Sequence, residues 1–263
     1  MKVELINKSN EEVSFILQDI SVSFANAIRR IMIGEVPTMA IEEVEFKKNN
    51  SAIYDETVAQ RLGLVVLKSD LKTYNLPEKC TCKGEGCAKC QVQLTLKERG
   101  AKTAHASSFK SKDPKITPVY GKTIIVKLLS GQEIELIATA VLGKGKDHAK
   151  FSPGLAIYKH EPIVEIKKQP KDAELIVKMC PKNLFEIKSG KLTLKKDYKK
   201  ECHLCEACQD YSEGAVTISE DDNKYWFTIE SWGSIPAKTI VKESANILAE
   251  KCDEFVEVMS KVK

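Results

Sequence analysis

Apolar and polar positions alternate at the start of the chain, in VELI and again in EEVSFIL, on either side of the polar segment NKSN. An alternation of period two places the apolar side chains on one face of a strand, and a polar segment between two such runs favours a turn. The spacing then changes, since Phe24, Ile28 and Ile31 fall on one helical face before Gly34 and Pro37. The beginning of the chain therefore predicts two strands and a helix that ends near Gly34.

Strand-like alternation returns in six later segments: IEEVEFK, VQLTL, TIIVKLL, EIELIATAVL, GAVTI and KYWFTIES. Two other segments predict a short helix (YDETVAQRLG) and a hairpin (SGKLTLKK). Residues 100–122 are polar and rich in Ser, Lys and Pro, which is typical of an irregular surface loop. Both ends of the chain combine strands with helices, and cysteine-bearing segments lie between them. This order predicts an α+β core domain built from both termini, with insertions.

The last predicted element is a long helix over residues 236–261. Its apolar residues recur at three- and four-residue spacing for about seven turns: Ile240, Ile247, Leu248, Cys252, Phe255, Met259 and Val262. Such a stripe either packs on the core of the same chain or binds a second subunit, and both interpretations stay open. Within it, Cys252 is expected to be a small buried apolar residue.

The composition is that of a globular protein, with 43% hydrophobic and 30% charged residues among 263. The net charge of +4 comes mainly from lysine, because arginine occurs only at Arg29, Arg30, Arg61 and Arg99. Arginine is the side chain best suited to bidentate recognition of phosphates and bases, so this balance argues against a dedicated nucleic-acid reader. No apolar run suits a signal peptide or spans a bilayer. A cytoplasmic location, reduced thiols and no membrane association are therefore expected.

Three of the nine cysteines are spaced at three-residue intervals in ECHLCEACQDY. Cys202, Cys205 and Cys208 follow the C-x2-C-x2-C part of bacterial ferredoxin motifs, in which a remote cysteine followed by proline completes a cluster. Position 212 is serine, but Cys180 is followed directly by Pro181. The spacing therefore predicts one iron–sulfur cluster, [4Fe–4S] with all four cysteines, or [3Fe–4S] if Cys180 is not bound. Zinc and free thiols are the alternatives.

A second group, Cys80, Cys82, Cys87 and Cys90, lies within the segment CTCKGEGCAKC. Four thiolates in a glycine-containing loop can form the closed tetrahedral shell of a structural zinc site. The spacing C-x-C-x4-C-x2-C differs from the usual pair of C-x2-C knuckles, so another metal or cluster and a metal-free loop stay open as alternatives. Zinc is the favoured prediction for this loop.

The usual catalytic and nucleotide-binding motifs are absent from the sequence, including G-x4-G-K-[ST], G-x-G-x-x-G, G-x-S-x-G and H-E-x-x-H. No active site is therefore expected on this chain. One competing function is an electron carrier that uses the cluster, although no flavin or nicotinamide motif accompanies it. Another is a zinc-ribbon protein that binds nucleic acid, although the net charge is modest.

Three longer segments resemble the signature stretches of one family: SFANAIRRIMIGEVPTMAIEEVEF, QRLGLVVLKSD and GKGKDHAKFSP. They are similar, in the same order, to the D subunits (subunit 3) of archaeal DNA-directed RNA polymerases. This family is related to the third-largest subunit of the eukaryotic enzyme and to the N-terminal domain of bacterial alpha. The loop CTCKGEGCAKC stands where eukaryotic relatives have a zinc loop. The cysteine triplet resembles a ferredoxin-like module that some archaeal members carry.

The resemblance implies an alpha-like dimerisation domain formed by residues 1–47 and 214–263. It also implies an inserted mixed α/β domain over residues 48–165 and a ferredoxin-like cluster module over residues 166–213. Such a subunit heterodimerises with subunit L, and the pair is the platform on which subunits N and P and the two large catalytic subunits assemble for transcription. DNA and RNA are then bound only through the complex. The dimer contacts are expected on the two amphipathic helices: Phe24, Ala25, Asn26, Ile28, Arg29, Arg30, Ile31, Ile247, Leu248, Phe255 and Met259.

Overall fold

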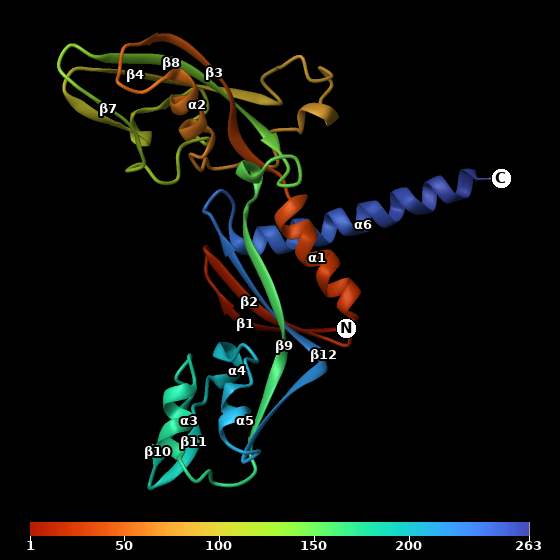
Figure 1. Ribbon diagram of the computed structural model, residues 1–263. Coiled ribbons are helices and arrows are strands. Elements are labelled where there is room, and N and C mark those ends of the chain that lie inside the picture. Colours follow the sequence, from red (N-terminus) through yellow and green to blue (C-terminus); the bar gives the residue numbers. More distant parts are fainter. Residues whose placement is uncertain (263) are drawn as a thin grey trace. The chain divides into compact units, whose positions relative to one another are not determined.

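The computed structural model describes residues 1–262, and the chain divides into two compact units (Figure 1). Unit 1 is assembled from three segments: Met1–Asn7, Ser14–Ala25 and Ile157–Thr228. Unit 2 contains the remaining described residues: Lys8–Val13, Asn26–Ala156 and those from Ile229 onward. Each unit therefore combines segments that are far apart in the sequence.

A four-stranded sheet supplies the long strands of unit 1. Its order is β1-β2-β12-β9, with the bounds β1 (Lys2–Lys8), β2 (Glu12–Gln18), β9 (Gly154–Ile166) and β12 (Val216–Ser231). The first two strands confirm the pair predicted at the start of the chain. Within unit 1, Phe15 and Phe227 stack with ring centroids 5.3 Å apart, and Tyr158 lies 5.4 Å from Phe227. Aromatic contacts across neighbouring strands therefore stabilise this sheet.

Strand β12 is one continuous strand, and the prediction of two separate strands from GAVTI and KYWFTIES was wrong. The polar segment SEDDN between them suggests a turn, but it stays extended because neighbouring segments continue to bind its backbone. The Asp19 amide donates to the Asn223 carbonyl at 3.0 Å, and Nδ1 of His160 lies 3.4 Å from the Asp221 carbonyl oxygen. Strand β9 had no counterpart among the predicted elements.

A small module with its own apolar core lies between β9 and β12 in the chain. It consists of three short helices and a hairpin: α3 (Ala173–Met179), β10 (Phe185–Lys188), β11 (Lys191–Leu194), α4 (Tyr198–Glu201) and α5 (Ala207–Tyr211). The hairpin confirms the prediction from SGKLTLKK. Its turn residues Ser189 and Gly190 have φ angles of 50° and 74°, as a two-residue hairpin turn requires.

Unit 2 contains two antiparallel sheets and the short helix α2 (Asp55–Gly63). The larger sheet has the order β3-β8-β4-β6 and the smaller one pairs β5 with β7: β3 (Thr38–Asn49), β4 (Gln91–Arg99), β5 (Lys102–His105), β6 (Lys110–Ser111), β7 (Ile124–Leu128) and β8 (Glu133–Gly143). Helix α2 packs into their core through Val58 and Leu62, which are both fully buried.

The segment 100–122 is more ordered than its composition predicts. It contains β5, β6 and a 3-10 helix (Ala106–Ser108), so the prediction of an irregular loop was only partly right. Ala104, Ala106 and Ile116 are completely buried and belong to the core of unit 2. These few apolar positions hold a mostly polar segment in place.

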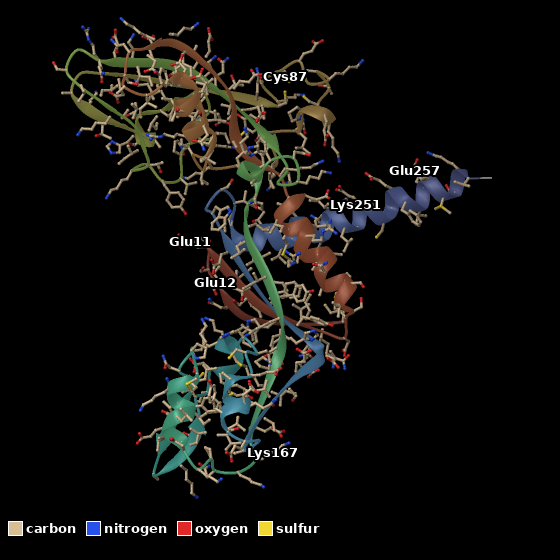
Figure 2. The ribbon with its side chains drawn as sticks, viewed as in Figure 1. Glu11, Glu12, Cys87, Lys167, Lys251 and Glu257 are labelled. Atoms are coloured by element: carbon tan, nitrogen blue, oxygen red, sulfur yellow. The ribbon has the colours of Figure 1, made fainter. Side chains whose placement is uncertain are left out.

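Two amphipathic helices confirm the longest sequence predictions: α1 (Val22–Gly34) and α6 (Ala237–Lys261). The first half of α6 is anchored by Ala237, Ile240 and Ser244, which are buried. The second half is different, because every residue from Lys251 to Val262 is exposed. Lys251, labelled with Glu257 in Figure 2, forms an ion pair with Glu35 at the end of α1.

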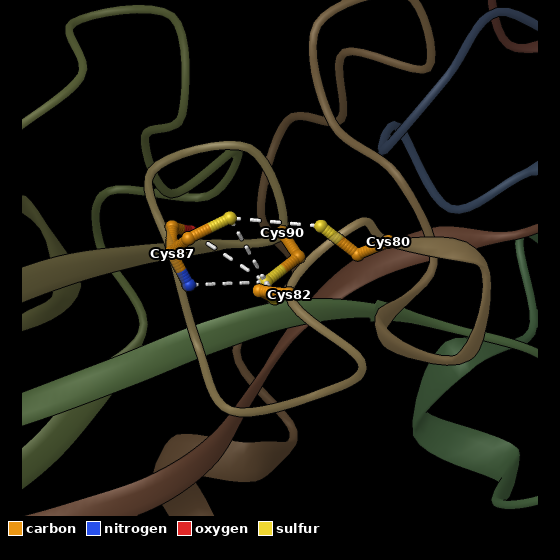
Figure 3. A group of neighbouring side chains, drawn as sticks. All are labelled: Cys80, Cys82, Cys87 and Cys90. Carbon is orange, nitrogen blue, oxygen red and sulfur yellow. Dashed lines mark hydrogen bonds between the residues drawn. The ribbon is translucent and has the colours of Figure 1, made fainter.

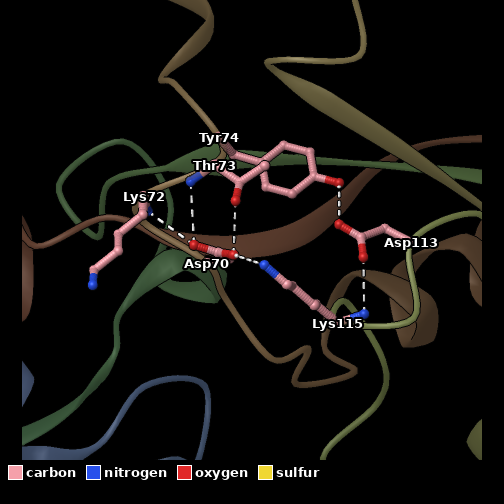
Figure 4. A network of polar contacts seen from close by, with 6 residues as sticks. All are labelled: Asp70, Lys72, Thr73, Tyr74, Asp113 and Lys115. Atoms are coloured by element: carbon pink, nitrogen blue, oxygen red, sulfur yellow. Dashed lines mark hydrogen bonds and ion pairs between the residues drawn. The ribbon is translucent and has the colours of Figure 1, made fainter.

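A polar network joins two loops of unit 2, one before and one after the cysteine-rich segment in the chain (Figure 4). Asp70 accepts hydrogen bonds from the Thr73 hydroxyl (2.8 Å) and from Nζ of Lys115 (3.2 Å). The Tyr74 hydroxyl donates to the Asp113 carboxylate at 2.8 Å. The hydrogen bond from Thr73 and those from nearby donors lower the pKa of Asp70 to about 2, and burial raises the pKa of Tyr74 to about 12. Both groups therefore keep their usual charge states over a wide pH range.

Candidate metal centres and dimer interface

The four cysteines of the segment 80–90 converge on one point (Figure 3). Their sulfur atoms all lie within 4.8 Å of one another. The distances are 3.5 Å for Cys80–Cys87, 3.5 Å for Cys82–Cys90 and 3.8 Å for Cys87–Cys90. A zinc ion with Zn–S bonds of about 2.3 Å holds tetrahedral thiolates about 3.8 Å apart. The arrangement therefore fits a single tetrahedral ion.

The backbone of this loop explains how four cysteines within eleven positions can meet. Lys83, Gly84 and Gly86 have φ angles of 54°, 88° and 94°, so the chain reverses between Cys82 and Cys87. The Cys87 amide then donates to the sulfur of Cys90 at 3.2 Å, as in a tight metal-binding turn. The two glycines supply the left-handed conformations with little strain.

The electrostatic environment of this loop favours the thiolate form of Cys82. A hydrogen bond from Cys80, aided by the Gly86 and Gly84 amides, lowers the pKa of Cys82 to about 6. Burial raises the pKa of Cys90 to about 12. Four thiolates cannot be held together without a compensating positive charge, which a divalent metal supplies.

The second cysteine group lines one apolar cavity in the small module of unit 1. Cys180 follows α3, Cys202 follows α4, and Cys205 and Cys208 lie before and within α5. The four share that cavity with apolar side chains that include Val164, Leu184, Phe185, Leu194 and Ile218. Cys180, Cys202 and Cys208 are buried, whereas Cys205 is exposed. The structure thus brings together the four residues that the sequence predicts as cluster ligands.

The loop that carries the triplet contains two unusual backbone conformations. Leu204 and Glu206 have φ angles of 58° and 60°, which non-glycine residues seldom adopt. These turns lie on either side of Cys205 and let Cys202 and Cys208 face the same cavity. Such strain persists only where the surrounding structure enforces it, and it is common at binding sites.

The spacing of the sulfur atoms differs between the two groups. Within the described part of the chain, no three sulfurs of the second group lie mutually within 4.8 Å, unlike those of the first group. A cluster places each thiolate on a different iron atom, so its ligands stand further apart than those of one zinc ion. Burial raises the pKa of Cys202, and it raises that of Cys208 to about 11. The four-thiol donor set and the apolar lining suit an iron–sulfur cluster.

The residues expected at the dimer interface differ in exposure. Ala25, Ile28 and Ile31 are buried within the chain, and Arg30, Phe255 and Met259 are exposed. The others are half-buried: Phe24, Asn26, Arg29, Ile247 and Leu248. The Asn26 side-chain oxygen accepts hydrogen bonds from Nε (3.2 Å) and Nη2 (3.0 Å) of Arg29, one turn along α1.

The second half of α6 carries an uncovered apolar stripe. Its large side chains, together with that of Val262 just after the helix, are more than half exposed: Phe255 (65%), Val256 (64%), Val258 (61%), Met259 (52%) and Val262 (64%). Cys252 is also exposed, so the prediction of a buried cysteine was wrong. The periodicity shows that the stripe exists, but no other part of the described chain covers it.

Comparison with known proteins identifies the family. Residues 14–252 match the RNA polymerase Rpb3/Rpb11 dimerisation domain. The chain belongs to this family. The match begins in β2 and ends at Cys252, so it includes all of α1 and the part of α6 up to that residue.

Curated Rpb3/Rpb11 relatives align over almost the whole chain. DNA-directed RNA polymerase subunit Rpo3 of Methanosphaera stadtmanae is 36% identical, over 97% of each chain. The Rpo3 subunits of Methanosarcina acetivorans and Pyrococcus horikoshii are 34% and 33% identical, each over 100% of this chain and 99% of theirs. The resemblance to the D subunits of archaeal polymerases is confirmed, and it favours an assembly role over electron transfer.

Two further features bear on this Rpb3/Rpb11 chain. None of the helices within residues 1–262 has the length and apolar character needed to cross a membrane.

Lys159 and Glu161 of β9 contact the cysteine module, although no motif in the sequence indicates them. Their partners lie about 40 positions further along the chain, which is why local patterns do not reveal the contacts.

Proposed function

We propose that this chain is a non-catalytic assembly subunit of a multisubunit DNA-directed RNA polymerase, and that it heterodimerises with subunit L. The observation that carries the proposal is the second half of α6. It is apolar and uncovered, in a chain that matches a dimerisation domain over most of its length. Apolar surface of this size on a helix is costly in water unless a partner covers it.

The same proposal assigns three parts to the chain. Residues 1–47 and 214–263 form the dimerisation domain, residues 48–165 an insertion domain, and residues 166–213 the cluster module. The pair with subunit L acts as the platform for subunits N and P and for the two large catalytic subunits. DNA and RNA are contacted only through the assembled complex, which acts in the cytoplasm.

We further propose an iron–sulfur cluster in the small module of unit 1, held by Cys180, Cys202, Cys205 and Cys208. The shared apolar cavity and its set of four cysteines support it. When bound, the cluster links the ends of α3 and α4 to α5 through thiolate bonds. The module has a small core of its own, so this linkage stabilises its fold.

Zinc is the proposed metal of the loop with Cys80, Cys82, Cys87 and Cys90, because the sulfur distances suit one tetrahedral ion. The loop leads directly into β4, a central strand of the larger sheet of unit 2. A structural ion at this point fixes the entry of the chain into the sheet.

Anaerobic co-expression with subunit L tests the three proposals together. We expect a one-to-one heterodimer that contains iron, sulfide and zinc. A Cys205→Ser variant should lose at least one iron atom per chain but keep zinc and the partner. Cys252→Ser changes a cysteine outside both groups and should keep both metals in full. A monodisperse lone chain without affinity for subunit L would refute the assembly function. A heterodimer without iron and sulfide would refute the cluster alone.

A further inference from the structure

Lys159 of β9 makes an unusual set of contacts with the cysteine module. Its side chain is half-buried, and Nζ donates to three backbone carbonyls: those of Lys199 (2.9 Å), Lys200 (2.6 Å) and Cys202 (2.5 Å). These carbonyls lie at the end of α4 and at the first residue after it. A lysine ammonium has three donors, so all of them are used here.

The position of the ammonium suits the electrostatics of the helix end. The last carbonyls of a helix have no partner within the helix and carry partial negative charge, so a cation is favourable there. The ring of Trp226 lies 5.8 Å from Nζ and adds a cation–π contact. The charge of Lys159 is therefore fixed in place by protein groups.

A second contact from the same strand holds α4. Glu161 is buried and forms an ion pair with Lys199, and Lys224 lies 3.6 Å from its other oxygen. Because residues two apart on a strand point to the same face, Lys159 and Glu161 act together on α4. Figure 1 shows α4 close to β9 within unit 1. The start of the cysteine triplet is thus clamped to a long strand.

We infer that Lys159 is a positioning residue for the proposed iron–sulfur centre: it fixes the backbone at Cys202 and places a half-buried positive charge beside the cluster. The inference rests on the proposed cluster and deepens it. The hydrogen bonds hold one ligand in its bound position, which slows the loss of iron. The fixed charge stabilises the more negative, reduced state, which raises the reduction potential.

Lys182 offers a matched control. It lies next to Pro181 on the rim of the same cavity, but its side chain is exposed and has no hydrogen-bond or ion-pair partner within the described residues. Lys182→Met removes the same charge from a solvated position. Lys159→Met removes the charge and the hydrogen bonds, and Lys159→Gln removes the charge but keeps a donor.

The test uses the full chain co-purified with subunit L under anaerobic conditions. Iron and sulfide content, the rate of iron loss to a chelator and the reduction potential from an EPR-monitored titration are measured for each variant. We expect Lys159→Met to lose iron about tenfold faster, which corresponds to about 1.4 kcal/mol, and to have a more negative potential. Lys159→Gln should slow the iron loss again but keep the shifted potential. Lys182→Met should lose iron at the rate of the unmodified chain and shift the potential less than Lys159→Met, because its charge is solvated.

Each outcome decides a separate point. If Lys159→Met loses the cluster altogether but still co-purifies with subunit L, the positioning role is supported. If its iron loss and potential equal those of the unmodified chain, the role is overturned. If Lys159→Gln has the same reduction potential as the unmodified chain, only the proposed effect of the charge is overturned, and the positioning role remains. If the unmodified complex contains no iron and sulfide, the proposed cluster itself is refuted. This result differs from one in which the cluster is present but Lys159→Met leaves its iron loss and potential unchanged.

Discussion

Phe255 gives the sharpest test of the dimer interface, because its ring has little to contact in the chain itself. It is 65% exposed, and Cys252, Met259 and Val262 continue its stripe along α6 and are exposed too. Truncation to alanine should therefore leave the thermal stability of the lone chain nearly unchanged. Binding to subunit L should weaken, because the ring is a large part of the apolar surface to be covered.

The size of the effect follows from the exposed area. A phenylalanine exposes about 200 Å² when uncovered, so 65% corresponds to about 130 Å². At about 25 cal/mol per Å², burial of this area contributes about 3 kcal/mol, or about 150-fold in the dissociation constant. The alanine side chain retains part of this apolar area, and neighbouring contacts can readjust. The dissociation constant is therefore expected to rise by between about 10-fold and 150-fold.

Titration calorimetry of the purified chain with subunit L measures this change directly. Tyr54→Ala is a matched control, since Tyr54 is an aromatic residue of unit 2 that is 82% exposed and lies outside both amphipathic helices. The Tyr54→Ala variant should bind subunit L with the same dissociation constant as the unmodified chain. If Phe255→Ala binds within twofold of the unmodified chain, the second half of α6 is not part of the interface.

Three other predictions concern the metal loop, acid stability and a close backbone approach. Cys82→Ser should abolish zinc binding and leave iron unchanged by metal analysis; retention of stoichiometric zinc would contradict the four-thiolate site. The Asp70 carboxyl has a pKa of about 2 in the folded chain, compared with an ordinary value of 3.8. Its contribution to the free energy of unfolding is therefore fully present above about pH 4 and is lost as the pH falls through 2. Urea titrations should thus show a stability gap between the unmodified chain and Asp70→Asn that narrows over this range, and a constant gap would argue against the assignment. Gly145→Ala should destabilise unit 2 by more than about 2 kcal/mol, because its Cβ would lie 2.1 Å from the Ile33 carbonyl oxygen, whereas at Gly34 the nearest atom is 3.9 Å away. Thermal melts that rank Gly34→Ala as equally damaging would contradict this explanation.

Regular periodicity was the most reliable guide to the fold. The helices α1 and α6, the first two strands and the hairpin at Ser189 and Gly190 all follow from local patterns of apolar, polar and turn residues. The cysteine spacing likewise selected two groups of four that the structure brings together. In these cases the neighbours in sequence already contain the interactions that decide the structure.

Long-range contacts decided the features that the sequence did not reveal. Strand β12 continues through SEDDN because segments distant in sequence bind its backbone there. The contacts of Lys159 with the end of α4 span about 40 residues and have no local signature. The exposure of Cys252 had a different cause, because a periodic stripe shows which face is apolar and does not show what covers it.

The exposed half of α6 also has a consequence for how the cell balances its subunits. A copy that finds no partner keeps five large apolar side chains in water, and such surfaces are what chaperones and proteases recognise. Under the proposed function, a copy paired with its partner buries them. Surplus copies of this chain would therefore be removed or would aggregate, so that the supply of its partner sets how many copies survive.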